Sequence, residues 1–295
     1  MTPPHKRIHV VINPASGKGQ PMLKYLADLC KQYDVEWDIS LTRKYGDATQ
    51  QARDALARGV DLVVGHGGDG TQHEIANAVM GTGKPMGILP GGTGNGFATE
   101  MGIPADYRQA VEVLCTSSNV RHIDVMQVGA PTQTGDQYCI QRLYAGIEPE
   151  QQVTREQKDK YGTLAYALLT RKQMKESVDA PMTLTIDGER IETHGLKCYI
   201  VNSGQGGKGS IDKEFKVDDG ILDVFVLSRE VRSKIAAAER FLHHFGKQAQ
   251  GYYWRGHEIT LECEPSKALW ADGEVFGRTP ISVKVLPGAL SVVVP

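Results

Sequence analysis

Along the N-terminal part of the chain, short runs rich in β-branched residues alternate with stretches of helical periodicity. This alternation is typical of β-α-β units, which build a parallel sheet covered by helices. We predict strands at residues 8–12, 35–41, 61–64, 86–89 and 120–128, and helices at 22–32, 47–56, 72–80 and 107–114. The fold class that follows is α/β, with a parallel-sheet domain at the N-terminus.

After residue 129 the pattern becomes β-rich. Asp187-Gly188 lies between two alternating runs and predicts a hairpin. The segment VKVLPGALSVVV predicts two strands about a turn at Pro287-Gly288. Further strands are predicted at 197–201, 221–227, 257–263 and 281–285, and two helices at 156–175 and 231–245. We expect an α/β domain at residues 1–128, completed by 283–295, and a β-rich sandwich domain at 129–282.

Composition narrows the class of protein. A length of 295 residues suits two moderate domains. The net charge of -2 provides no basic field, which argues against a nucleic-acid partner. The five cysteines form no CxxC pair, so a reducing cytoplasm is expected rather than a disulfide framework or a zinc site. No segment approaches the roughly 20 apolar residues of a membrane helix, so a membrane would be met only at its surface.

Three glycine-rich or polar segments directly follow predicted strands. They are VINPASGKG at 11–19, GGDGTQHEIANAV at 67–79 and GILPGGTGNGFA at 87–98. Glycine lets backbone N–H groups approach a phosphate closely, and a following helix offers its positive N-terminus. Because parallel strands end at the same edge of a sheet, the three segments together predict a phosphate-binding site there.

Asp69 is a carboxylate among the glycines of the second segment, where an anionic ligand would be repelled. Carboxylates are natural ligands of Mg²⁺, which accompanies nucleoside triphosphates, so we interpret Asp69 as a residue that organises this ion. The alternative is a tight turn in which Asp69 caps the helix. The glycines Gly65, Gly67 and Gly70 match the dinucleotide pattern GxGxxG, but the acidic residue expected ~20 positions later is missing.

The order and spacing of NPASGKG, GGDGTQHEIANAV and GILPGGTGNGFA resemble the diacylglycerol kinase catalytic domain family. This family includes bacterial soluble lipid kinases, sphingosine kinases and ceramide kinases, with NAD kinases as distant relatives. The resemblance extends to DDGILDV at 218–224 and ADGEVFGRTPISVKVLPGAL at 271–290, and so covers nearly the whole chain. It implies an NAD kinase-like N-terminal domain, a C-terminal β-sandwich and an ATP site between them.

The resemblance also implies a role for individual residues. The positions that match the nucleotide site of the family are Asn13, Thr42, Gly67, Gly68, Asp69, Gly70, Thr71 and Thr93. Asp272 and Glu274, in the sequence DGE, match the region of the catalytic base. We assign the base to this pair and the organisation of Mg²⁺ to Asp69. Asp69 is the alternative base, as favoured in sphingosine kinases, and a hairpin turn with solvated acids is the alternative for DGE.

Bacterial members of the family also have a structural Mg²⁺ in the second domain. Its ligands match Lys216, Asp219 and Ile221, the first and last through backbone carbonyls. A plain turn before a strand is the alternative for this segment. The chain departs from many bacterial lipid kinases at Gly96, where they have aspartate, and so lacks one carboxylate of the usual Mg²⁺–water network.

The resemblance implies transfer of the γ-phosphate of ATP to a lipid hydroxyl, with Mg²⁺ as cofactor and a lipid at the membrane surface as acceptor. Diacylglycerol, phosphatidylglycerol and sphingoid bases all present such a hydroxyl. One alternative is a kinase for a soluble acceptor, as in NAD kinases, and another is a non-catalytic nucleotide-binding protein. The sequence does not indicate an oligomeric state.

Overall fold

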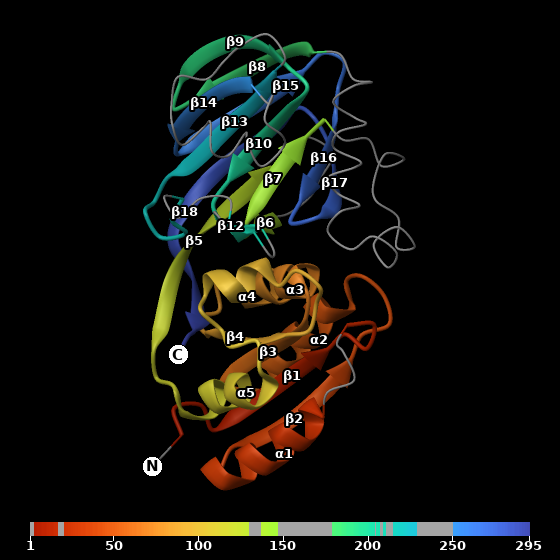
Figure 1. Cartoon of the computed structure of the whole chain (residues 1–295), viewed down its shortest axis with the longest axis vertical. Coiled ribbons are helices and arrows are strands. Elements are labelled where there is room, and N and C mark those ends of the chain that lie inside the picture. The colour runs from red at the N-terminus through yellow and green to blue at the C-terminus, as the bar shows by residue number, and fades with distance from the viewer. Residues whose placement is uncertain are drawn as a thin grey trace. The chain divides into compact units, whose positions relative to one another are not determined.

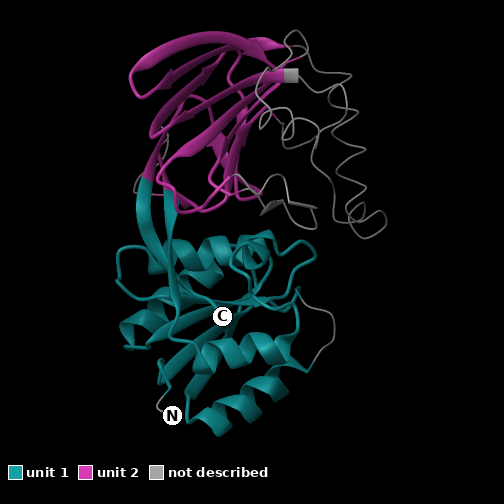
Figure 2. Cartoon of the chain, turned by 60° about the vertical axis from the view of Figure 1, so that its left-hand side comes forward, with its two compact units in different colours: residues 1–125, 205–210, 286–295 teal, residues 126–204, 211–285 magenta. Residues whose placement is uncertain are grey.

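The computed structural model describes residues 3–16, 21–129, 137–146, 179–203, 205–206, 209–210, 215–228 and 250–295. The chain forms two compact units, coloured separately in Figure 2. The first comprises Met1–Val125, Gln205–Ser210 and Leu286–Pro295, and the second Met126–Gly204 and Ile211–Val285. The domain boundaries expected from the sequence stay predictions. The helices predicted at 156–175 and 231–245 lie outside the described residues.

The first unit contains a parallel sheet in the order β2-β1-β3-β4. Its strands are β1 (Arg7–Ile12), β2 (Glu36–Leu41), β3 (Leu62–Gly67) and β4 (Met86–Pro90). Every residue of β3 and β4 is buried, as expected for central parallel strands covered on both faces. The predicted parallel α/β class is confirmed.

Helices cover both faces of this sheet. They are α1 (Met22–Tyr33), α2 (Asp47–Ala57), α3 (Asp69–Val79), α4 (Gly96–Glu100) and α5 (Tyr107–Thr116). Helix α1 packs against α5, and α3 packs against α2 and α4. Figure 1 shows α1 and α5 on one side of the sheet and α3 and α4 on the other. In the described part of the chain no helix is long and apolar enough to cross a membrane.

The second unit is built from antiparallel strands. One sheet has the order β14-β13-β10-β7-β16-β17, and another contains β18-β15-β8-β9 together with β5 and β6. Of these strands, β5 and β18 also extend into the first unit. The bounds are β5 (Val120–Gly129), β6 (Gln137–Cys139), β7 (Arg142–Ala145), β8 (Ala180–Ile186), β9 (Glu189–Gly195), β10 (Lys197–Val201), β13 (Leu222–Ser228), β14 (Gln250–Gly256), β15 (Glu258–Cys263), β16 (Ala268–Ala271), β17 (Glu274–Arg278) and β18 (Ile281–Val293). A short pair, β11 (Gln205–Gly206) and β12 (Gly209–Ser210), forms a separate ribbon that belongs to the first unit.

Both large sheets contribute apolar side chains to one core in the second unit. Leu184 and Ile259 come from β8 and β15, and Ile200 and Val224 from β10 and β13. The alternation of buried and exposed residues along β8 is typical of a sheet with one buried face. The predicted β-sandwich class is thereby confirmed.

The predicted hairpin at Asp187-Gly188 is confirmed, since β8 and β9 pair from Ile186 and Glu189 onward. The predicted turn at Pro287-Gly288 is wrong, because β18 continues through both residues as one strand. At its start β18 pairs antiparallel with β15, and near its end Val292 pairs with Met86 of β4. Gly288 has a φ of 60° and donates its N–H to Asp124 at 2.8 Å, so the chain bends there without reversing.

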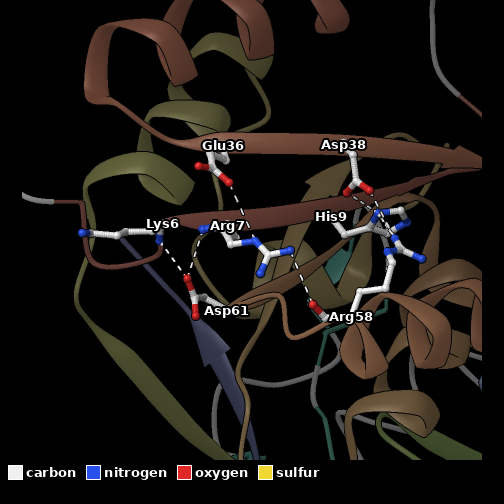
Figure 3. A network of polar contacts seen from close by, with 7 residues as sticks. All are labelled: Lys6, Arg7, His9, Glu36, Asp38, Arg58 and Asp61. Carbon is white, nitrogen blue, oxygen red and sulfur yellow. Dashed lines mark hydrogen bonds and ion pairs between the residues drawn. The ribbon is translucent and has the colours of Figure 1, made fainter.

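A polar network ties together the amino ends of β1 and β2, the end of α2 and the start of β3 (Figure 3). The carboxylate of Asp61 accepts from the backbone N–H groups of Lys6 at 3.1 Å and Arg7 at 3.0 Å. Arg58, which caps the C-terminus of α2, contacts Asp38 of β2 at 3.2 Å. Because the ion pair between Arg58 and Asp38 is exposed, it adds little stability. The two amide bonds to Asp61 join the start of β1 to the residue before β3.

Candidate active site

The ends of β1, β2 and β3 lie beside one another at the carboxyl edge of the parallel sheet. The backbone N–H of Asn13 donates to the carbonyl of His66 at 2.9 Å. The N–H of Thr42 donates to the carbonyl of Ile12 at 2.9 Å. Two of the predicted nucleotide-binding residues, Asn13 and Thr42, therefore follow neighbouring strand ends. Residues 17–19, the end of the segment VINPASGKG, lie outside the described residues.

The first glycine loop, residues 67–71, joins β3 to α3. A Cβ atom at Gly67 would lie only 2.2 Å from Oγ1 of Thr71, so no side chain fits at this position. Thr71 is buried, and the side-chain amide of Asn13 donates to its hydroxyl at 3.4 Å. The glycine at position 67 is thus required by the close approach of the helix that follows it.

The second glycine loop, residues 91–96, packs directly against the first. The N–H of Gly91 donates to the carbonyl of Gly67 at 2.9 Å. A Cβ atom at Gly92 would lie 2.6 Å from the Cα of Gly68, so the two backbones touch. Both loops therefore present backbone at the same edge of the sheet, as a phosphate-binding site requires.

Asp69 links the two glycine loops. Its carboxylate accepts from the backbone N–H of Gly96 at 3.2 Å and of Phe97 at 2.9 Å, the first two residues of α4. Asp69 therefore caps α4 rather than its own helix, α3, which has Gly68 at its N-cap. A carboxylate has about four lone-pair positions, so two amide bonds leave acceptors for a water or a cation. This donor set fits a Mg²⁺ ion that arrives with a nucleotide.

A cavity of about 330 Å³ lies along the second glycine loop and the start of α5. Thr93, an exposed member of the predicted nucleotide set, is one of its lining residues. The lining residues are Pro90, Gly91, Gly92, Thr93, Gly94, Asn95, Ala98, Thr99, Ile103, Ala105 and Tyr107. Asn95 holds the loop in shape, because its side chain makes two hydrogen bonds with the backbone of Gly92, at 2.7 and 2.8 Å. The lining thus combines the backbone of the glycine loop with the apolar side chains of Ala98, Ile103 and Ala105. Such a lining suits a small ligand that has both polar groups and an apolar ring.

In the second unit, Asp272 lies in the two-residue turn that joins β16 to β17. Its φ is 47°, and that of the following Gly273 is 94°, as a type I′ hairpin requires. The Asp272 side chain is buried, and backbone N–H groups donate to its carboxylate from residues 140, 141 and 142, at 2.8, 2.9 and 3.0 Å. The thiol of Cys139 also donates to it at 3.2 Å. Burial raises the pKa of this thiol, which keeps its proton available for donation.

Glu274, the other acid of the DGE sequence, has a different environment. It is the first residue of β17 and is exposed. Within the described part of the chain no hydrogen bond or ion pair engages its carboxylate. The turn anticipated as an alternative for DGE is therefore present, and the two acids differ in how strongly they are already bound.

The predicted metal ligands Lys216, Asp219 and Ile221 precede β13. The Asp219 carboxylate contacts the Arg255 guanidinium at 2.6 Å and accepts from the N–H of Ile221 at 3.4 Å. Arg255 also contacts Asp223 at 3.2 Å. Burial raises the pKa of Asp223 to about 6. The described residues contain no group of three His, Cys, Asp or Glu residues that could hold a metal. A metal at Asp219 would have to compete with the guanidinium.

We expect removal of divalent cations with EDTA to leave the thermal unfolding midpoint of the nucleotide-free protein within about 1 °C of its value in Mg²⁺. The reason is that Arg255 already serves as the counter-ion of Asp219 and Asp223. In Arg255→Met, the two acids lose this counter-ion, so the midpoint falls and Mg²⁺ restores part of it. A drop on EDTA treatment of the unmodified protein would instead support the metal predicted at Lys216, Asp219 and Ile221. Differential scanning calorimetry provides the measurement.

Two buried polar residues near the glycine loops were not predicted from the sequence. His66 is the last residue but one of β3, its Nε2 is 3.0 Å from the hydroxyl of Tyr107, and burial lowers its pKa. Glu74 on α3 is 8% exposed and contacts the start of α2. An acid in the middle of a helix whose other residues are largely apolar or small is the one sequence signal that could have indicated Glu74.

Comparison with known proteins agrees with this geometry. Residues 7–128 match the family model of the diacylglycerol kinase catalytic domain, and residues 141–294 match that of the YegS C-terminal NAD kinase beta sandwich-like domain. The chain thus contains a diacylglycerol kinase catalytic domain, and, through the model that matches more than half of its length, it belongs to the family of the YegS C-terminal NAD kinase beta sandwich-like domain. The resemblance drawn from its motifs is confirmed.

Individual relatives are similar over most of the chain. A protein of Staphylococcus epidermidis, provisionally named a lipid kinase, is 28% identical over 90% of this chain and 87% of its own length. An uncharacterised protein of Synechocystis is 25% identical over 97% of this chain and 70% of its own length. A crystal structure described as a diacylglycerol kinase from Bacillus anthracis superposes with a TM-score of 0.78 at 25% identity, covering 99% of this chain and 97% of that one. This family member thus has relatives described as lipid kinases.

Proposed function

We propose that the protein is an ATP-dependent lipid kinase that transfers the γ-phosphate of ATP to a lipid hydroxyl. The observation that supports this most directly is the pair of glycine loops joined through Asp69 at the carboxyl ends of β3 and β4. Family membership supports the same reaction class. Diacylglycerol, phosphatidylglycerol and sphingoid bases are the acceptors that we propose to test.

In this proposal the first unit binds the nucleotide. The backbone amides of the two glycine loops and the hydroxyl of Thr93 hold its phosphates, and Asn13 and Thr42 complete the site. The carboxylate of Asp69, with the lone pairs that its two amide bonds leave free, would hold the Mg²⁺ ion that comes with ATP. When bound, this ion neutralises charge on the phosphates during transfer. Because position 96 is glycine and provides no second carboxylate, Asp69 is the acid that we assign to Mg²⁺ in these two loops.

The acceptor hydroxyl needs a base, and we assign this role to Glu274. Its carboxylate is exposed, whereas that of Asp272 is already bound by three backbone amides and a thiol. Glu274 takes the proton of the hydroxyl as the hydroxyl oxygen bonds to the γ-phosphorus, and ADP leaves with the electrons of the broken P–O bond. Asp272 holds the hairpin that presents Glu274. Asp69 remains the alternative base.

A lipid acceptor places the reaction at a membrane surface. We propose a cytoplasmic protein that contacts the membrane peripherally and has no nucleic-acid partner. A kinase for a soluble acceptor, as in the NAD kinases, is the alternative within the same family. The third candidate is a protein that binds nucleotide but does not catalyse phosphoryl transfer. Such a protein would not require the exposed carboxylate of Glu274.

The test is transfer of labelled γ-phosphate from Mg·ATP into a panel of acceptors. Vesicles containing diacylglycerol, phosphatidylglycerol or sphingosine are compared with NAD and free nucleosides. We expect label in at least one lipid and none in the soluble acceptors. Label in NAD alone would establish the soluble-acceptor alternative. Saturable ATP binding without label in any acceptor would establish the non-catalytic one.

A further inference from the structure

Glu74 of α3 caps the N-terminus of a different helix, α2. Its Oε2 atom accepts from the backbone N–H of Gly46 at 2.8 Å, of Ala48 at 3.1 Å and of Thr49 at 3.4 Å. The hydroxyl of Thr49 donates back to the carbonyl of Glu74 at 3.0 Å. The N-cap residue of α2 is Gly46, which has no side chain of its own to satisfy these amides. The cap is therefore supplied from α3.

A second carboxylate, that of Asp47, binds backbone amides in the segment between β2 and α2. Asp47 accepts from the N–H of Arg43 at 2.8 Å and of Lys44 at 3.1 Å. With Glu74, the two acids bind five backbone amides between residues 43 and 49. This segment directly follows Thr42, whose own N–H is bound to the carbonyl of Ile12. The position of Thr42 at the sheet edge is thus determined from both sides.

We call residues 42–49 the Thr42 segment. Because α3 begins at the first glycine loop, Glu74 connects that loop to the Thr42 segment. Asp69 and Glu74 lie on the same helix, and each caps a neighbouring one, α4 and α2 respectively. Burial raises the pKa of Glu74 above its ordinary value, while the amide bonds act against this rise. Burying a carboxylate costs desolvation free energy, and the presence of Glu74 at this position suggests a role besides stabilising one helix.

We propose that Glu74 is a positioning residue of the ATP site, which holds the Thr42 segment at the correct distance from the first glycine loop. This inference rests on the proposed function, because it assumes that both elements contact the nucleotide. Glu74 itself touches backbone and not the ligand. Its loss lets the start of α2 and the preceding segment move, so nucleotide affinity falls before the chemical step is affected.

The far end of α2 offers a matched control. There Asp61 accepts from two backbone amides, those of Lys6 and Arg7, at the amino ends of the strands (Figure 3). Removing the Asp61 carboxylate deletes the same type of bond as removing that of Glu74. However, it does so at the edge of the sheet opposite to Thr42. General destabilisation and displacement of the nucleotide site can therefore be separated.

The experiment compares Glu74→Ala, Glu74→Gln and Asp61→Ala by calorimetric titration with Mg·ATP and by thermal unfolding. We expect the dissociation constant of Mg·ATP to rise roughly tenfold in Glu74→Ala, with a fall in midpoint of roughly 2–6 °C. Glu74→Gln retains an acceptor oxygen, so it should recover most of the affinity. Asp61→Ala should lower the midpoint but change the dissociation constant by less than about twofold.

Two results would overturn the inference. One is parental affinity for Mg·ATP in Glu74→Ala, or, if the alanine variant does not fold, in Glu74→Asp, whose shorter side chain withdraws the carboxylate from these amides. The other is an equal loss of affinity in Asp61→Ala, which would show that destabilisation alone weakens binding. Failure of the proposed function looks different, since the unmodified protein would then either not bind Mg·ATP or bind it without transferring label to any lipid.

Discussion

Glutamine in place of Glu274 is expected to lower kcat for lipid phosphorylation by about 10²–10⁴-fold, because the acceptor hydroxyl loses its base. The fold should not change, since this side chain is exposed and makes no hydrogen bond within the described residues. The thermal midpoint should therefore equal that of the unmodified protein. Steady-state kinetics with labelled ATP and the active lipid acceptor provide the measurement.

Asp272→Asn is the informative partner of this variant. An amide can accept from some of the donors around residue 272, but its own NH₂ group faces at least one of them. We expect a loss of roughly 1–3 kcal/mol in the free energy of unfolding. We expect activity to fall only to the extent that the β16–β17 hairpin shifts and displaces Glu274. Full activity in Glu274→Gln together with a large loss in a stably folded Asp272→Asn would reverse the two roles, and full activity in both would transfer the base to Asp69.

The second large effect is expected for Asp69→Ala, with a loss of at least about 10²-fold in kcat/KM for Mg·ATP. Two functions disappear together, namely the link from α3 to the backbone of α4 and the carboxylate available to Mg²⁺. Asp69→Asn separates them, because its carbonyl oxygen still accepts one amide bond while the negative charge is gone. We expect this variant to need a higher Mg²⁺ concentration for half-maximal rate.

The measurement is a Mg²⁺ titration of initial rates at saturating ATP for both Asp69 variants. Circular dichroism and the thermal midpoint serve as controls for folding. If Asp69→Ala phosphorylated lipid at the parental rate, the role of this residue in metal binding would be refuted. The amide bonds to α4 would then be its only contribution.

Local sequence patterns predicted most of the described fold. Buried runs such as that of β3 are recognisable because, apart from His66, the residues of this central parallel strand are apolar or small. The two Asp-Gly turns need positive φ at both positions, and few other dipeptides adopt that conformation readily. The prediction of a turn at Pro287-Gly288 was wrong for the opposite reason, since the conformation of this segment depends on the strands with which β18 pairs. Because β18 pairs with β15 near its start and with β4 near its end, the chain bends at Gly288 and runs on instead of reversing.

The sequence by itself determined that glycine-rich turns follow neighbouring parallel strands and that acids lie among or beside them. It did not determine what those acids bind. Asp69 bonds to amides 27 and 28 residues away, and Asp272 to amides 130 to 132 residues away. Turns and strand ends depend on backbone preferences of a few adjacent residues, which a sequence displays directly. The partner of a buried carboxylate is decided by which distant amides packing leaves unsatisfied, and only the tertiary structure contains that information.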